Sequence, residues 1–258
     1  MANFLDVIFN PWLGPVLNLP AFWAILIISA GITLLVTVVY KYTTNQAEMK
    51  RIKTDLKKYQ KEMRETKDLK KLKGIQSKAL ELNMKYMMSS FKSTLYTFIP
   101  IIIIFAWLNM HIAYIPIQPQ QEFPVTATFG AGAHGNVTLS ATPDLNLTTP
   151  ATAEIVDDKV VWRMKGDVGE YKLTVTYNNE IYDHTVLIQP QDAKVPTYDT
   201  PQKPIQDSKL KMISVGYTTV HPFGESFNLF GWYPGWLAAY IVLSLILSAA
   251  FRKILDVY

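Results

Sequence analysis

The segment MKYMMSSFKSTLYTFIPIIIIFAWLNMHIAY, Met84–Tyr114, determines how the rest of this chain is arranged. Its first residues are polar and rich in methionine. From Leu95 to Tyr114 it becomes an apolar run without Asp, Glu, Lys or Arg. A run of about 20 apolar residues is long enough to cross a bilayer as a helix. A basic, helix-forming segment precedes this run and a segment with β-strand patterns follows it, so we expect the two flanks to lie on opposite sides of a membrane.

Two further apolar runs have the same properties. They are Phe22–Tyr40 and Pro234–Phe251, and neither contains a charged residue. The chain is 49% hydrophobic, and much of that content lies in these runs. Buried helices of soluble proteins of this length usually keep a polar face. The sequence therefore predicts three transmembrane helices.

The basic residues predict the topology. No Lys or Arg precedes the first run, whereas Lys41 follows it directly and Arg252 follows the third. Residues 41–94 contain 15 basic and 6 acidic residues, a net charge of +9, and residues 115–231 contain 8 and 13, a net charge of −5. Basic segments next to spans stay in the cytoplasm. We expect a multi-pass protein of the plasma membrane, with its N-terminus outside and its C-terminus in the cytoplasm.

The cytoplasmic segment has the composition of helices. Residues 42–94 contain no proline and one glycine, Gly74. Apolar residues recur every three or four positions on both sides of the charged stretch 64–68, which favours two arms of an antiparallel helical hairpin, or coiled coil. The apolar positions are Met49, Ile52, Leu56, Tyr59 and Met63 in the first arm, and Leu72, Ile75, Ala79, Leu82 and Tyr86 in the second.

The charge of this hairpin suggests a partner. A net positive surface attracts ribosomal RNA or anionic lipid, and an ordinary solvated coiled coil is the simpler alternative. The candidate contact residues are Lys57, Lys58, Lys61, Arg64, Lys67, Lys70, Lys71 and Lys73.

Residues 115–231 have the patterns of an antiparallel β domain. Short alternating segments are separated by turn residues, including Asn178-Asn179, which favours a hairpin turn. The stretch from Asp167 to Tyr171, with Trp162 upstream, resembles the tyrosine corner of immunoglobulin-like sandwiches. Residues 190–208, rich in Pro, Gln and Asp, are expected to form an extended linker. Asn136 and Asn146 begin glycosylation sequons.

Hydroxyl side chains recur at helical spacing in the cytoplasmic half of each predicted span. If the three polar faces converge, they line a hydrophilic groove that opens to the cytoplasm. The alternative is that these small residues pack between helices and bond to their own backbone. The candidate groove residues are Ser29, Thr33, Thr37, Lys41, Ser90, Thr94, Thr97, Tyr240, Ser244, Ser248 and Arg252.

Three methionines lie near the expected mouth of this groove: Met84, Met87 and Met88. Methionine is flexible and fits varied apolar surfaces, so these side chains are candidates for contact with a client segment. The simpler alternative is that they are ordinary interfacial residues.

The block Lys85–Met110, KYMMSSFKSTLYTFIPIIIIFAWLNM, resembles the archaeal YidC-like proteins, the three-span branch of the YidC/Oxa superfamily of membrane protein insertases. The resemblance covers residues 1–114 and the third span. It implies that the protein inserts or chaperones hydrophobic segments, beside the ribosome, through a groove facing the cytoplasm. Bacterial members carry a charged residue inside the groove, whereas no span interior is charged here. The resemblance implies nascent membrane proteins and the ribosome as partners, with the Sec translocon or a small membrane subunit as further candidates.

Other function classes lack support. The chain has no cysteine, which excludes disulfides and thiol chemistry. No phosphate-binding loop, metal-ligand spacing or catalytic constellation is present, so we expect neither enzymatic activity nor a cofactor or metal. A membrane-anchored cell-surface protein that acts through its β domain remains the alternative.

The predicted segments are as follows, in chain order. Residues 1–21 are an outer interfacial segment in which Pro11, Pro15 and Pro20 stop any long helix, 22–41 the first transmembrane helix, 42–94 the hairpin, 95–114 the second transmembrane helix, 115–231 the extracellular β domain, 232–251 the third transmembrane helix and 252–258 the cytoplasmic tail.

Overall fold

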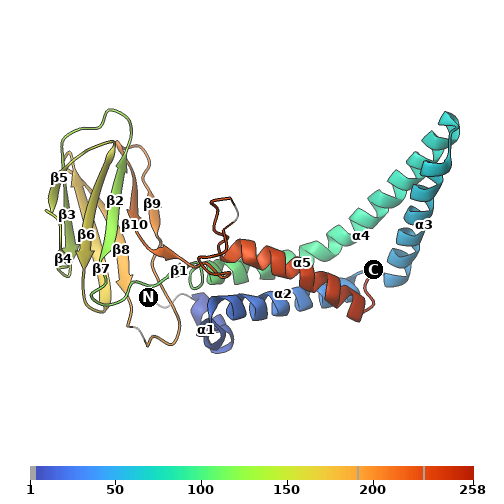
Figure 1. The fold of residues 1–258 in the computed structure, drawn as a ribbon, viewed down its shortest axis with the longest axis horizontal. Coiled ribbons are helices and arrows are strands. Elements are labelled where there is room, and N and C mark those ends of the chain that lie inside the picture. The colour runs from blue at the N-terminus through green and yellow to red at the C-terminus, as the bar shows by residue number, and fades with distance from the viewer. Residues whose placement is uncertain (1–3, 191, 229) are drawn as a thin grey trace. The chain divides into compact units, whose positions relative to one another are not determined.

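The computed structural model describes residues 4–190, 192–228 and 230–258 (Figure 1). The chain divides into two compact units. Unit 1 joins the N-terminal segment through Ala24 to Trp107–Leu237, and unit 2 joins Ile25–Ala106 to Ala238–Tyr258.

Among the described residues, three helices are long and apolar enough to cross a membrane, as the sequence predicts. They are α2 (Ala21–Thr43), α4 (Leu69–Asn109) and α5 (Trp236–Ile254). The most apolar window of α2 is 39% buried within the protein, whereas those of α4 and α5 are 22% and 6% buried. Most of the α5 surface is therefore free to contact lipid or another chain.

Unit 2 contains α3 (Gln46–Glu65) and most of α4, joined by residues 66–68. Asn45 caps α3 by accepting a hydrogen bond from the Glu48 backbone N–H at 3.1 Å. Asp68 accepts one from the Lys70 backbone N–H at 2.9 Å at the start of α4. Met49 and Ile52 are buried on α3 and Ala79 on α4, and the other seven predicted apolar positions are half-buried.

α4 is one continuous helix, although the sequence pattern predicts a boundary between the hairpin and the second span at residues 94 and 95. No glycine or proline interrupts residues 75–99. Pro100 lies inside the helix, which is tolerated in apolar helices because the lost backbone bond can be compensated locally. The second arm and the second span are therefore parts of a single 41-residue helix.

Unit 1 begins with α1 (Phe4–Leu17), which contains Pro11 and Pro15 although prolines were expected to stop such a helix. Tertiary contacts explain why it persists. Asn10 accepts a hydrogen bond from Trp107 Nε1 at 3.1 Å. Gly14 lies so close to Val195 that a Cβ there would approach Val195 Cγ2 to 2.9 Å.

His111 joins three segments of unit 1. Its side chain is fully buried, with Nε2 2.9 Å from Asp6 Oδ1 on α1 and Nδ1 2.6 Å from the Pro196 carbonyl oxygen. The ring lies 4.5 Å from that of Trp107. A carbonyl oxygen can only accept, so Nδ1 donates, and the second bond needs one further proton on Nε2 or on the carboxyl group. His111 therefore holds α1 and the segment around Pro196 to the end of α4.

The β domain of unit 1 consists of two open antiparallel sheets and a two-stranded pair (Figure 1). Phe129 and Tyr177 meet across the two larger sheets with ring centroids 5.0 Å apart. The five-stranded sheet has the order β4 (Asn146–Leu147), β6 (Lys159–Lys165), β2 (Phe123–Phe129), β10 (Leu210–Val215) and β9 (Gln202–Pro204). The four-stranded sheet has the order β5 (Thr152–Glu154), β3 (Asn136–Thr142), β7 (Gly169–Tyr177) and β8 (Glu180–Ile188), and β1 (Tyr114–Ile115) pairs with β11 (Thr218–Thr219).

Two local features predicted from the sequence of the β domain, a hairpin turn and the hydrogen bond of a tyrosine corner, occur in the structure. Asn178 and Asn179 have φ values of 49° and 65° between β7 and β8, as a type I′ hairpin turn requires. Tyr171 donates its hydroxyl hydrogen to the Asp167 carbonyl at 3.0 Å, which is the bond of a tyrosine corner. Trp162 is fully buried.

The segment 190–208, expected as a linker, is tied into unit 1 where the structure describes it. It contributes β9 to the five-stranded sheet. Tyr198 is buried, and its hydroxyl group accepts a hydrogen bond from the Ala113 backbone N–H at 2.9 Å. Burial raises the pKa of this phenol well above its ordinary value.

Candidate functional site

Three hydroxyl side chains form a buried row on one face of α2. Ser29, Thr33 and Thr37 follow at intervals of four residues, and their exposed fractions are 0%, 6% and 4%. Thr37 Oγ1 donates a hydrogen bond to the Thr33 carbonyl at 2.7 Å. Within the described part of the chain, Ser29 Oγ and Thr33 Oγ1 have no hydrogen-bond partner. Burying a polar group without a hydrogen-bond partner costs free energy. A new hydrogen-bond partner for these two hydroxyls would therefore be stabilising.

Hydroxyl groups also connect α2 with α4. The Tyr40 hydroxyl oxygen lies 3.2 Å from Ser90 Oγ, and Thr43 Oγ1 donates to Ser93 Oγ at 2.7 Å. Ser93 is buried. Such bonds between helices hold two apolar segments in a defined register.

Ser93 was not among the predicted site residues, although its spacing was informative. Tyr86, Ser90, Ser93 and Thr97 follow at intervals of four, three and four, which continues the apolar rhythm of the hairpin arm. Thr97 is buried on this face and donates to the Thr94 carbonyl at 3.0 Å. Thr94 itself is exposed and donates to the Ser90 carbonyl at 3.1 Å. Following the inward face of the whole helix would have selected Ser93 in place of Thr94.

The two cations predicted at the groove mouth have partners inside unit 2. Lys41 Nζ donates to the Leu255 carbonyl oxygen at 2.9 Å. The guanidinium of Arg252 lies 4.9 Å from the centroid of the Tyr40 ring, a cation–π distance. These contacts connect the end of α2 to α5 and to the residues that follow it.

The predicted residues on α5 are half-buried. Tyr240 packs edge-to-face against Phe105 of α4, with ring centroids 4.8 Å apart. Ser244 Oγ donates to the Ile241 carbonyl at 2.9 Å, which is a bond within its own helix. Ser248 lies one turn further along the same face.

An exposed apolar stripe runs along α4. Met84, Met87 and Met88 have exposed fractions of 53%, 62% and 62%. At intervals of three and four residues the stripe continues through Phe91, Leu95, Phe98 and Ile102, which are 50–58% exposed. A continuous apolar face of this length marks contact with lipid or with another apolar chain.

The eight basic candidates of the hairpin are all exposed. Lys58 and Lys61 lie 3.9 Å from Glu62 and Glu65, whereas the remaining six have no ion-pair partner among the described residues. An ion pair joins α3 and α4. Lys85 Nζ of α4 lies 2.6 Å from Glu48 Oε1 of α3, and this lysine lowers the pKa of the Glu48 carboxyl group. The two sequon asparagines, Asn136 and Asn146, are exposed in the β domain.

In the described part of the chain, three candidate membrane helices, two of which carry buried hydroxyls, and a β-rich domain indicate an integral membrane protein. The family model for integral membrane proteins of the EMC3/TMCO1-like kind matches residues 6–150, more than half of the 258 residues, so the chain belongs to that family. This family is related to the YidC/Oxa superfamily of membrane insertases, which supports the resemblance at that level but not the archaeal YidC-like branch specifically. No curated protein and no solved structure matches the chain.

Proposed function

We propose that this protein is a membrane protein insertase or chaperone that guides hydrophobic segments of clients from the cytoplasm into the bilayer. Membership of an insertase-related family supports the class of function. The observation that carries the mechanism is the pair of buried hydroxyls without partners, Ser29 and Thr33, on a helix long enough to span a membrane. The candidate groove residues and the methionines form the client path.

The physical benefit concerns the polar groups of the client. An unsatisfied backbone N–H or C=O in hydrocarbon costs several kcal/mol. Ser29 and Thr33 offer hydroxyl groups that both donate and accept. A client hairpin that contacts them enters the membrane partway at lower cost, while its apolar residues leave sideways into lipid.

The path must open for this to happen, because Ser29, Thr33, Thr37 and Thr97 are buried within the protein. We assign the opening to displacement of α5, the least buried of the three candidate spans. Its contacts to α2 and α4 include a cation–π contact by Arg252 and a ring contact by Tyr240. The exposed methionines of α4 then receive the client first.

We infer the protein's branch, location, orientation and partners from the sequence. The archaeal three-span YidC-like branch, a plasma-membrane location and the outside N-terminus remain part of the proposal, with an immunoglobulin-like outer domain and glycans on Asn136 and Asn146. Ribosomal RNA or anionic lipid would meet the basic hairpin. A Sec translocon or a small membrane subunit would be a further partner. The proposed activity uses no covalent chemistry, cofactor or metal.

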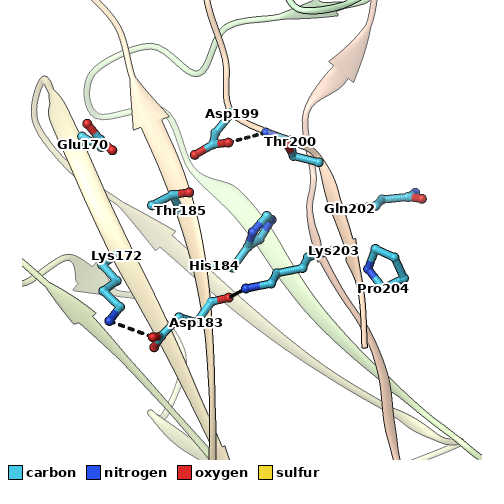
Figure 2. Close-up of a pocket in the computed structure, with 10 residues that line it drawn as sticks. All are labelled: Glu170, Lys172, Asp183, His184, Thr185, Asp199, Thr200, Gln202, Lys203 and Pro204. Carbon is cyan, nitrogen blue, oxygen red and sulfur yellow. Dashed lines mark hydrogen bonds and ion pairs between the residues drawn. The ribbon is translucent and has the colours of Figure 1, made fainter. Parts of the chain in front are cut away.

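A surface interaction protein anchored by its helices is the second candidate, because the β domain contains a polar cavity lined by ten residues (Figure 2). The two proposals predict different consequences of mutation. An insertase loses function when large side chains replace Ser29 or Thr33. A surface interaction protein loses function when the β domain is altered.

The decisive experiment is site-specific photocrosslinking in native membranes. Probes at Thr33, Thr37, Thr97, Ser244 and Ser248 are compared with a control at Ile103, an exposed residue of the α4 span. We expect crosslinks to newly made membrane proteins from the five test positions and lipid adducts from the control. Capture of only lipid or the protein's own helices at the test positions would exclude the groove and favour the second candidate.

A further inference from the structure

A cavity of about 640 Å³ lies between two free sheet edges of the β domain (Figure 2). β8 is the last strand of the four-stranded sheet and β9 the last strand of the five-stranded sheet. The volume falls within the range of about 300–1,000 Å³ that is typical of small-ligand sites. None of its lining residues belongs to the insertase site proposed above, so the inference below is independent of that function.

His184 projects from β8 into this cavity and is only 5% exposed. Its Nε2 atom has no hydrogen-bond partner within the described residues. The ring is hydrogen-bonded to the backbone of Thr200, and since Nε2 is free, that bond is made by Nδ1. The Thr200 backbone N–H already donates to Asp199 Oδ1 at 2.6 Å, so the carbonyl oxygen is the group left to accept from His184.

This bond defines the state of the ring. With a hydrogen on Nδ1, the neutral imidazole has a lone pair on Nε2, which is then an acceptor. Burial lowers the pKa of His184, outweighing the carboxylate of Asp199, and so keeps the ring neutral near pH 7. A buried acceptor without a donor is unfavourable, and a ligand that donates to Nε2 would remove that penalty.

The cationic groups of the cavity are already engaged. Lys172 Nζ lies 2.7 Å from Asp183 Oδ2 and lowers the pKa of that carboxyl group. Lys203 Nζ donates to the Asp183 carbonyl oxygen, as the dashed lines in Figure 2 show. Among the described residues, the carboxylate of Glu170 has neither a hydrogen-bond nor an ion-pair partner, and Asp199 accepts only from the adjacent backbone N–H. The available groups are thus acceptors.

We propose that this cavity binds an organic cation, a primary ammonium or guanidinium group, whose N–H hydrogens are accepted by His184 Nε2 and by the carboxylate of Asp199, while Glu170 adds negative charge to the cavity lining. The three carboxylates of the lining outnumber its two lysines, which favours a positive ligand. A metal ion fits poorly, because the described residues contain no cluster of three or more His, Asp or Glu arranged to bind one. The cation can belong to a small amine or to a Lys or Arg side chain of a polypeptide.

The test uses the full chain in nanodiscs of phosphatidylcholine, a lipid without net charge. Binding of agmatine, which has both cationic groups, is measured by calorimetry beside a short peptide with one central arginine. Binding of either agmatine or the peptide supports the site. Which of the two binds shows whether the cation comes from a small amine or from a side chain of a polypeptide. Glutarate is the anionic comparison. If glutarate binds more tightly than both cations, or if neither cation binds at millimolar concentration, the proposal is wrong.

Variants then locate the binding. Asp199→Asn removes one charged acceptor and should weaken cation binding about tenfold or more, whereas Glu170→Gln removes only a charge from the cavity lining and should weaken it less. The matched control is Glu154→Gln, the same change on an exposed residue of β5 outside the cavity, which should leave affinity unchanged. An equal loss in all three variants would show only non-specific attraction to an acidic domain and would overturn the assignment.

His184 supplies a direct readout. Agmatine should shift the ¹⁵N resonance of His184 Nε2 in the wild-type protein, because a new hydrogen bond changes the shielding of that nitrogen. His184→Gln assigns the resonance, and binding by the Glu154→Gln protein should reproduce the shift. Agmatine binding without any change at His184 would exclude the imidazole as a ligand-binding group.

Discussion

Single buried side chains explain much of how unit 1 holds together. His111 bonds to Asp6 on α1 and to the carbonyl of Pro196, while its ring packs on Trp107. Both nitrogens of the His111 ring make a hydrogen bond. Their partners come from different segments, so neither the end of α4 nor α1 alone would position the ring. Position 111 therefore stabilises contacts among segments distant in the sequence.

Replacing His111 should destabilise unit 1 strongly. His111→Ala leaves the mostly buried Asp6 carboxylate without this partner, which costs about 3 kcal/mol for a buried pair. Thermal unfolding in nanodiscs measures the change, and His134→Ala, at an exposed histidine of the β domain, is the control.

A double variant tests the pairing itself. Asp6→Ala combined with His111→Ala should cost less than the two single changes added together, because each single change already removes the interaction. Strict additivity would show that the two side chains act separately.

The pKa of His184 predicts how the stability of the protein depends on pH. Its pKa is lowered in the folded protein, so below the ordinary value of 6.5 the unfolded chain takes up a proton that the native ring resists. Stability from this residue is complete above pH 6.5 and is lost as pH falls toward the native pKa. Unfolding measured between pH 7.5 and 4.5 should show a decline that is smaller in His184→Gln. The same pH dependence of stability in the wild-type protein and in His184→Gln would contradict this prediction.

At the scale of elements, α4 is the main organising unit of the helical part. Its inward face starts with the apolar residues of the hairpin arm and continues with Ser93 and Thr97. Its outward face presents Met84 and Met88 and then the apolar residues of the span. Because a helix resists bending except at sites such as Pro100, the hairpin arm and the part of the proposed client path before that proline belong to one continuous helix.

The hairpin tip should bind anionic surfaces by charge alone. Lys67→Glu, Lys70→Glu and Lys71→Glu together should weaken binding to vesicles that contain phosphatidylglycerol by more than about 100-fold, since each lysine contributes about 1 kcal/mol. Replacing the same three residues with arginine preserves the charge and should preserve binding. Cosedimentation at two salt concentrations measures the effect. Unchanged binding in the glutamate variant would place the contact elsewhere.

At the scale of the whole molecule, the two units have separate tasks in the proposed function. Unit 2 contains the hydroxyl row and the client path, and unit 1 contains the β domain and its cavity. Opposite net charges of +9 on residues 41–94 and −5 on residues 115–231 suit opposite sides of a membrane, because basic segments remain in the cytoplasm.

The absence of cysteine makes this topology directly testable. Single cysteines at Ser77 of the hairpin and Ser140 of the β domain are both at exposed positions. In intact cells a membrane-impermeant maleimide should label Ser140→Cys, and label Ser77→Cys only after the membrane is permeabilised. The reverse labelling pattern would invert the proposed orientation.

Features that depend on local composition and period can be read directly from the residues in order along the chain. Three uncharged apolar runs specify the candidate spans because length and polarity decide whether a helix can cross hydrocarbon. Alternation specifies the longer strands, and the turn at Asn178-Asn179 follows from the backbone preference of asparagine.

Contacts between segments that are distant in the sequence become visible only in the folded protein. The pairing of His111 with Asp6, the selection of Ser93 over Thr94, and the partners of Lys41 and Arg252 all depend on contacts between separate elements. The cavity around His184 exists because the edges of β8 and β9, strands of different sheets, approach each other. Such contacts depend on three-dimensional packing, which a local pattern of residues does not specify.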